Sequence, residues 1–232
     1  MSTPTLGTEK AGGVILDLDG TLVDSVYQQV VAWRRALDDC GIQLSVWKIH
    51  RRIGMSGDLL INALVRETNR LIDSALVDDL RKRYTVAYAQ ERLSVRPLPG
   101  SRELIEALIS DKISWAIATS SRAANAAPAL DMLGVPQDAV VVTSEQVRHA
   151  KPDPDLFLKA AELLSVDLRQ SLVVGDSVWD LLAARRAGAL GVGLLSGGYG
   201  REELERAGAY RVYDDPLELL SHLDEVGIRR AL

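Results

Sequence analysis

The sequence of 232 residues contains a single cysteine, Cys40, so no disulfide can form within the chain. A chain of this length buries a sufficient core without disulfides, and we therefore expect a reducing, cytoplasmic setting. Histidine is also scarce, with three in the whole chain. The sequence therefore lacks the histidine and cysteine clusters that are typical of zinc sites.

Long apolar runs and an excess of positive charge are absent too. No run approaches the ~20 residues of a membrane span, and the segment from Met1 to Lys10 lacks the basic-then-apolar pattern of a secretion signal and is expected to be a loose tail. Lys and Arg number 27 against 32 Asp and Glu, which gives a net charge of −5. This balance disfavours nucleic acid or an anionic membrane as a partner.

What the sequence does contain, outside residues 25–94, is an alternation of short β-branched segments with amphipathic ones. Such alternation predicts right-handed crossovers and a parallel sheet. The fold class is therefore α/β, with a Rossmann-like parallel sheet. Strands are predicted at 13–19, 113–118, 139–143, 171–174, 190–195 and 210–213. Helices are predicted at 101–110, 122–133, 154–164, 178–187 and 216–226.

Residues 25–94 have a different pattern, in which apolar residues recur every three or four positions without a convincing strand. A structureless loop of this length would be implausible. We therefore expect an α/β core formed by residues 1–24 and 95–232, interrupted by an all-helical domain at 25–94. This segment is called the helical insert below.

In an open parallel sheet, ligands bind at the carboxyl ends of the strands. Four distant segments should meet at that edge and bring acids, hydroxyl groups and one lysine to it. The polar residues of these segments are Asp17, Asp19, Gly20, Thr21, Thr119, Ser120, Ser121, Lys151, Asp176 and Asp180.

Carboxylates gathered at one point repel each other unless a cation lies between them. Oxygen ligands favour Mg²⁺ over zinc, and Mg²⁺ held by carboxylates shares its other positions with water and substrate phosphate. We therefore predict a Mg²⁺ site whose ligands are Asp17, Asp19, Asp176 and Asp180, the last either directly or through water.

The same arrangement predicts phosphoryl chemistry. Asp17 is the expected nucleophile, and strand alternation places Asp19 on its side, where it can serve as general acid and then general base. Thr119 and Lys151 are expected to hold the non-bridging phosphate oxygens. Phosphate or substrate binding is further assigned to Gly20, Thr21, Ser120, Ser121, Gln29 and Arg52.

Each residue also has a simpler interpretation. Asp17, Asp19 and Asp180 can be turn or helix-capping residues, Thr119 and Ser120 an N-cap, and Lys151 a solvated charge. The combination favours a site, because an unpaired Asp17 in an apolar strand would be costly. Pro152 also forces an extended backbone on Lys151, and Asp153 and Pro154 are expected to begin the next helix.

Four sequence motifs resemble those of the haloacid dehalogenase-like hydrolase superfamily, in the same order along the chain. They are Asp17-Leu-Asp-Gly-Thr21, Thr119 after an apolar strand, Lys151-Pro152, and Gly175-Asp176 followed by Asp180. The helical insert resembles the four-helix cap of phosphoglycolate phosphatases and β-phosphoglucomutases. The resemblance covers the chain from about Gly13 onwards. It implies a Mg²⁺-dependent phosphate-ester hydrolase in which the cap closes over the site and the Asp19 backbone carbonyl binds the metal.

Within that superfamily, Asp19 argues against a dehalogenase, which lacks the second acid of the first motif. The mutases carry a cap histidine where this chain has Gln28 or Gln29, and a basic residue where it has Gly57. We therefore predict hydrolysis of a small phosphorylated metabolite, such as a phosphoglycolate-like acid, a sugar phosphate or a nucleotide. A phosphosugar mutase is the alternative.

Specificity is expected to reside in the cap, because the core site contacts only the phosphate. Arg51 and Arg52 fit either a second anionic group or a solvated basic run, and His50 either a surface residue or a catalyst. The Gly197–Gly200 loop fits either a turn or a second phosphate contact. The sequence does not determine the oligomeric state.

Two non-enzymatic readings remain. A response-regulator receiver also has a phosphorylatable Asp, but it is about half as long and lacks a helical insert. A degenerate relative that binds phosphate without turnover would be expected to have lost motif residues, and all of them are present here.

Overall fold

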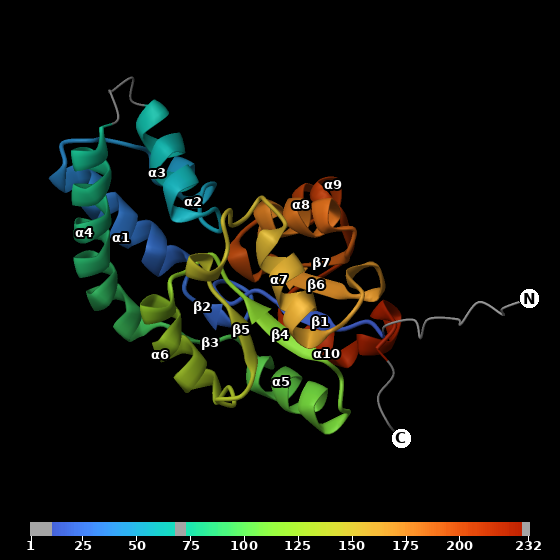
Figure 1. The fold of residues 1–232 in the computed structure, drawn as a ribbon. Helices are drawn as coiled ribbons and strands as arrows, with labels where there is room; N and C mark the ends of the chain where they lie inside the picture. The colour runs from blue at the N-terminus through green and yellow to red at the C-terminus, as the bar shows by residue number, and fades with distance from the viewer. Residues whose placement is uncertain (1–10, 68–72, 229–232) are drawn as a thin grey trace, which may run out of the picture.

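A computed structural model describes residues 11–67 and 73–228 of the protein (Figure 1). The tail expected at residues 1–10 lies outside these ranges. None of the helices within them is long and apolar enough to cross a membrane.

A parallel sheet forms the centre of the molecule, as the alternating pattern predicts. Within the described residues it has six strands in the order β5-β4-β1-β6-β7-β8. β1 pairs with β4 on one side and with β6 on the other. The strands are β1 (Val14–Leu16), β4 (Trp115–Ala118), β5 (Val140–Val142), β6 (Leu172–Gly175), β7 (Leu190–Leu194) and β8 (Ala209–Tyr213).

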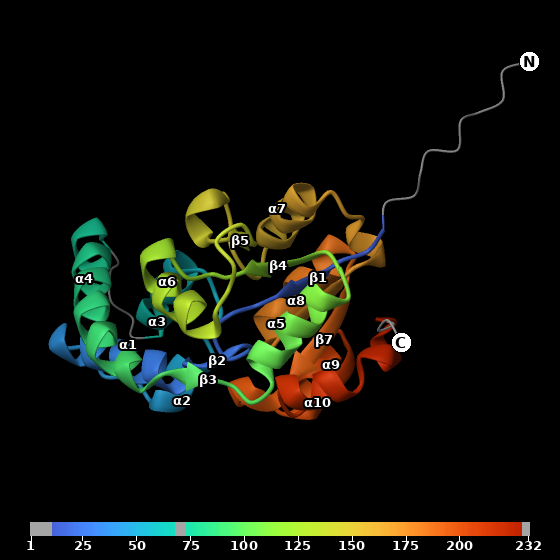
Figure 2. The same cartoon turned by 90° about the horizontal axis from the view of Figure 1, so that it is seen from below.

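Helices cover both faces of this sheet (Figure 2). Successive residues of β1 point to opposite faces, so Val14 and Leu16 join one buried cluster and Ile15 joins another. The first cluster lies under α5 (Ser101–Ser110), α6 (Ala123–Leu133) and α10 (Pro216–Ser221). The second lies under α7 (Asp155–Leu164) and α8 (Val178–Ala187), and α9 (Arg201–Ala207) packs beside α8.

The helical insert contains α1 (Val26–Asp39), α2 (Val46–His50), α3 (Gly57–Arg66) and α4 (Ser74–Glu91). These helices bury a cluster of their own, which includes Trp33, Ile49 and Leu80. The chain enters the insert through β2 (Val23–Asp24) and leaves it through β3 (Arg96–Pro97). These two short strands pair antiparallel, so the two connections lie side by side.

The structure differs from the predicted elements in a few places. β1 ends at Leu16, so Asp17–Asp19 lie beyond the strand and not within it. The helix predicted at 216–226 ends at Ser221 and is followed by a 3-10 turn at Leu223–Val226. α7 begins at Asp155 with Pro154 as its N-cap, one residue later than the Asp153-Pro154 pattern predicts.

Candidate active site

The loop after β1 places its two acids in different surroundings. The Asp17 backbone N–H donates to the carbonyl of Val174 in β6, and its side chain is buried. The Asp19 carboxylate accepts hydrogen bonds from the hydroxyls of Ser25, at 2.7 Å, and Ser121, at 2.7 Å. Asp17 therefore points into the protein, whereas Asp19 is held between the start of the helical insert and the loop after β4.

Lys151 is the largest fully buried side chain of the described residues. Its Nζ lies 2.5 Å from Asp17 Oδ1 and 2.7 Å from Asp180 Oδ1. The ammonium also lies 5.4 Å from the ring centroid of Phe157, the single phenylalanine of the chain. A buried ammonium is costly unless charges compensate it, and two carboxylates do so here. Lys151 is thus fixed inside the site and is not a solvated surface charge.

The end of β6 supplies the remaining acids. Asp180 Oδ2 accepts from the hydroxyl and backbone N–H of Ser177, which caps α8. Thr21 donates its hydroxyl to Asp176 at 3.0 Å. Close packing requires a glycine at position 175, since a Cβ there would lie 2.3 Å from the Cβ of Asp180. Local capping and close packing therefore orient both carboxylates before any ligand binds.

Burial and neighbouring charges shift the pKa values of the acids and of the lysine in this cluster. Burial, together with the charge of Asp180, raises the pKa of Asp17 to about 7 even though Lys151 opposes the shift. Burial and the neighbouring carboxylates of Asp180 and Asp17 raise the pKa of Asp176 well above its usual range. Burial alone would lower the pKa of Lys151, but Asp17 and Asp180 outweigh it and raise that pKa.

One ligand oxygen each of Asp17, Asp176 and Asp180 lies within 4.8 Å of the others. These hard oxygen donors fit a divalent cation such as Mg²⁺, which would relieve the repulsion that raises the pKa of Asp17 and Asp176. The structure does not bring the Asp19 carboxylate into this group, because Ser25 and Ser121 hold it elsewhere. Three of the four predicted metal ligands therefore gather through their side chains.

The loop after β4 brings the predicted hydroxyl groups to the same edge. Thr119 is buried, and its hydroxyl accepts from the Ser121 backbone N–H at 3.0 Å, so its hydrogen can still be donated. Ser121 bonds Asp19, as described, and Ser120 donates to the carbonyl of Gly54 in the helical insert. In this structure Ser120, Ser121 and Thr21 therefore bond protein groups around the site.

The two predicted substrate residues of the helical insert differ in their contacts. Gln29 is buried and its side chain hydrogen-bonds Tyr88, whose pKa is raised by burial and by the charge of Asp19. Gln29 follows Ser25 by one helical turn, since its backbone N–H donates to the Ser25 carbonyl, and the Ser25 hydroxyl bonds Asp19. Arg52 pairs with Glu67 at 3.1 Å, within the insert.

The segment from His50 to Ser56 docks onto the sheet domain at several points. The Arg51 guanidinium pairs with Glu203 at 2.8 Å. The backbone carbonyl of Arg51 accepts hydrogen bonds from the Trp179 indole N–H and the Tyr199 hydroxyl. The Ser56 backbone N–H donates to the carbonyl of Lys151 at 3.0 Å. The Arg51 side chain is therefore paired with a residue of the sheet domain while 34% of it stays exposed.

Gly20, which is predicted to bind phosphate or substrate, supports the site through close packing: its φ is +82°, and a Cβ there would lie 2.5 Å from Asp176 Oδ2. Sequence reasoning missed the serines that orient two of the acids. Ser25 and Ser177 hold Asp19 and Asp180. Ser177 could have been found as the N-cap before Val178, with Asp180 completing a capping box. Ser25 bonds a side chain six positions away, and no local pattern predicts that.

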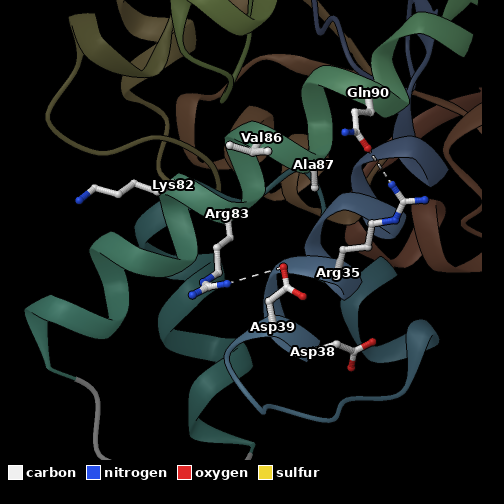
Figure 3. Close-up of a pocket in the computed structure, with 8 residues that line it drawn as sticks. All are labelled: Arg35, Asp38, Asp39, Lys82, Arg83, Val86, Ala87 and Gln90. Atoms are coloured by element: carbon white, nitrogen blue, oxygen red, sulfur yellow. Dashed lines mark hydrogen bonds and ion pairs between the residues drawn. The ribbon is translucent and has the colours of Figure 1, made fainter.

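A hollow of about 590 Å³ lies elsewhere, on the surface between α1 and α4 (Figure 3). Among the residues that line it, Arg83 pairs with Asp39 at 3.7 Å, and the Arg35 guanidinium donates a hydrogen bond to the Gln90 side-chain oxygen at 3.4 Å. It contains none of the predicted site residues, so the chemistry is assigned to the acid cluster.

Comparison with known proteins agrees with this geometry. The family model "haloacid dehalogenase-like hydrolase" matches residues 12–188. A phosphoglycolate phosphatase of Neisseria gonorrhoeae is 33% identical over 194 residues, which is 82% of this chain and 82% of the relative. A fructose-1-phosphate phosphatase of Escherichia coli is 32% identical over 201 residues, which is 78% of this chain and 94% of the relative.

A crystal structure of a hydrolase from Pseudomonas syringae has 49% sequence identity and a TM-score of 0.91, with 94% of this chain and 100% of that chain covered. Fold, site and relatives thus define the class of the protein, a hydrolase built on a Rossmann-like parallel sheet. More specifically, the chain belongs to the haloacid dehalogenase-like hydrolase family, which confirms the family resemblance seen in its four motifs.

Proposed function

We propose that the protein is a Mg²⁺-dependent phosphatase that hydrolyses a small phosphorylated metabolite through an aspartyl-phosphate intermediate. The observation that carries this proposal is the buried cluster in which Lys151 bridges Asp17 and Asp180 beside Asp176. A nucleophilic carboxylate, a fixed ammonium and a cation site together are the components that phosphoryl transfer needs.

In the first step, an Asp17 carboxylate oxygen attacks phosphorus and the bond to the leaving oxygen breaks. Asp19 protonates that oxygen, which completes release of the alcohol. Lys151 and the Thr119 hydroxyl donate to the non-bridging oxygens, whose charge changes in the transition state. Bound between Asp17, Asp176 and Asp180, the cation would neutralise part of the phosphate charge.

In the second step, Asp19 removes a proton from a water molecule that attacks the phosphorus of the acyl phosphate. The bond to Asp17 breaks, and the carboxylate is regenerated with release of inorganic phosphate. Ser25 and Ser121 hold the Asp19 carboxylate in one orientation for both proton transfers. Because Asp19 gives up its proton in the first step, it is ionised when the second step needs a base.

We propose residues 25–94 as the cap of this enzyme and residues 1–24 with 95–232 as its catalytic domain. The separate apolar cluster of the insert and its paired connections support this division. The relatives named above act on a phosphorylated acid and a phosphorylated sugar, which supports a small metabolite as the substrate. Gln29, one helical turn after the Ser25 that bonds Asp19, is proposed to contact the leaving group, and Arg52 would contribute only if its pair with Glu67 opens.

A phosphosugar mutase is less well supported. Gln28 or Gln29 occupies the place of the mutase histidine, and neither amide can shuttle a proton. Gly57 has no side chain with which to bind a second phosphate. Water is therefore the proposed acceptor.

The test is hydrolysis of p-nitrophenyl phosphate by the purified protein with Mg²⁺. Repeated turnover that EDTA stops and Mg²⁺ restores is expected. A single equivalent of released nitrophenol would indicate a phosphate acceptor without phosphatase activity, and turnover that survives exhaustive chelation would contradict the metal site. A panel of phosphorylated acids, sugars and nucleotides then identifies the substrate class.

A further inference from the structure

His50, at the end of α2, contacts the sheet domain although it belongs to the helical insert. Its side chain is 9% exposed, and Nε2 lies 2.8 Å from the backbone carbonyl of Gly197. A carbonyl oxygen can only accept a hydrogen bond, so Nε2 is the donor. Because this nitrogen is already engaged, His50 is neither a solvated surface residue nor available there as a proton shuttle.

Two aromatic rings fix the orientation of this imidazole. Tyr27 of α1 stacks on it with a centroid distance of 5.4 Å and an interplanar angle of 8°. Tyr199 lies 5.6 Å away at 32° and comes from the same loop as Gly197. The rings therefore direct Nε2 towards the loop after β7 when the insert is docked.

That loop lies directly against the acid cluster. A Cβ on Gly197 would approach to 1.8 Å from Asp176 Oδ2, so only glycine fits beside this carboxylate. Ser196 donates to the Gly20 carbonyl at 2.6 Å, and Gly20 also packs against Asp176. Asp176 is thus enclosed by two glycine-containing loops, and His50 holds one of them.

We propose that His50 is a positioning residue that couples docking of the helical insert to the placement of Asp176 for the divalent cation. When the insert docks, the His50 hydrogen bond holds Gly197 against Asp176 and restricts that carboxylate to the orientation seen here. When the insert moves away, this restraint is lost and the cation is held less tightly. The inference rests on the proposed metal-dependent function.

The decisive comparison is between His50→Gln and His50→Asn. The two amides have the same polarity, but only the longer glutamine side chain places its N–H group near the position of Nε2. Isothermal titration with Mg²⁺ alone measures the affinity, and the Mg²⁺ dependence of p-nitrophenyl phosphate hydrolysis gives a second value. Loss of a residue that orients a metal ligand typically weakens binding about 10–100-fold.

We expect H50N to bind Mg²⁺ about tenfold more weakly than the wild type, which is the lower end of that range, and H50Q to retain most of the affinity. His222→Ala is the matched control, because His222 also bonds a backbone carbonyl, that of Glu218 at 2.8 Å, and also stacks on a tyrosine, but lies after α10. H222A should bind Mg²⁺ as the wild type does.

Equal Mg²⁺ affinity in H50N and the wild type would overturn the inference, and so would an equal loss in H50N and H50Q. Neither of these results would affect the proposed function, provided that the wild type hydrolyses p-nitrophenyl phosphate with Mg²⁺. Failure of the wild type itself to bind Mg²⁺ would overturn both. Circular dichroism of each variant excludes misfolding, and His50→Ala, which also removes the donor to the Gly197 carbonyl, replaces H50N if that variant does not fold.

Discussion

At the scale of single residues, the site is dominated by Asp17, a carboxyl that is buried, paired with an ammonium and still raised in pKa to about 7. Lysine lowers this pKa, but burial and a second acid outweigh it. A site with excess negative charge is ready to accept a cation. The proposed nucleophile is therefore also a residue that favours binding of the metal.

Asp17→Asn is expected to reduce turnover of p-nitrophenyl phosphate to less than about one hundredth of the wild-type rate, because an amide cannot form the acyl phosphate. The side chains are nearly the same size, so the variant should fold, which thermal unfolding checks. Activity above that level would remove Asp17 from the nucleophile role.

Asp19→Asn is expected to slow both protonation of the leaving group and hydrolysis of the intermediate, because the amide can neither give nor take the proton. Mass spectrometry after acid quench should then detect the phosphorylated protein, which one phosphoryl group makes about 80 Da heavier. Kinetics identical to those of the wild type would exclude Asp19 as the acid–base residue.

A pH dependence of stability follows from Asp17 in metal-free protein. Its pKa is higher in the folded state than in the unfolded state, so its contribution to stability is present below about pH 4 and is lost as the pH rises through about 7. In EDTA, the free energy of unfolding of D17N relative to the wild type should therefore increase between pH 5 and pH 8. A constant difference across this range would contradict the raised pKa.

Residue roles were predicted where they depend on position along a strand, and missed where they depend on contacts between loops. Asp17, Lys151, Asp176 and Asp180 gather because strand order brings their loops to one edge, which a parallel sheet predicts. The bond from Thr21 to Asp176 joins residues 155 positions apart. Such a pairing depends on side-chain packing in three dimensions, which no spacing in the sequence encodes.

At the scale of elements, the loop between β1 and β2 packs closely against the acid cluster. Gly20→Ala would introduce a Cβ 2.5 Å from Asp176 Oδ2 at a backbone φ of +82°. We expect a loss of Mg²⁺ affinity and activity, because Asp176 must move away. Gly134→Ala is the matched control: its φ is +71°, but a Cβ there meets nothing within 4 Å.

Both variants share a backbone cost of about 1–2 kcal/mol for an alanine in the left-handed region, so any additional loss in G20A reports the clash with Asp176. Thermal unfolding and Mg²⁺ titration measure the two effects. Equal behaviour of the two variants would show that Gly20 is required only for its turn.

The prediction of elements was best for long periodic segments and poorest for short ones. The helices and the parallel strands follow their apolar patterns, because each buries a defined face in a cluster. The pairing of β2 with β3 was missed, since two-residue strands are too short to show an alternation. α10 ends at Ser221 and not at 226, where a 3-10 turn continues the apolar pattern.

At the scale of the whole molecule, the apolar residues form separate clusters in the sheet domain and in the helical insert. Leu80 of α4 is fully buried in the cluster of the insert. Leu80→Ala is expected to cost about 2–5 kcal/mol of stability. Hydrogen exchange should then show loss of protection concentrated in α1–α4, whereas uniform loss across β1, β4 and β6 would indicate that the two parts unfold as one unit.

The antiparallel pair β2–β3 has a consequence for how such an enzyme diversifies. The chain enters and leaves the insert at neighbouring points, so the two ends of the insert lie side by side on the sheet domain. Another set of helices could replace the helical insert without changing the order of the six strands or the carboxylates at their ends. Selection for a new leaving group can therefore act on one continuous stretch of the gene, while the phosphoryl chemistry stays encoded outside it.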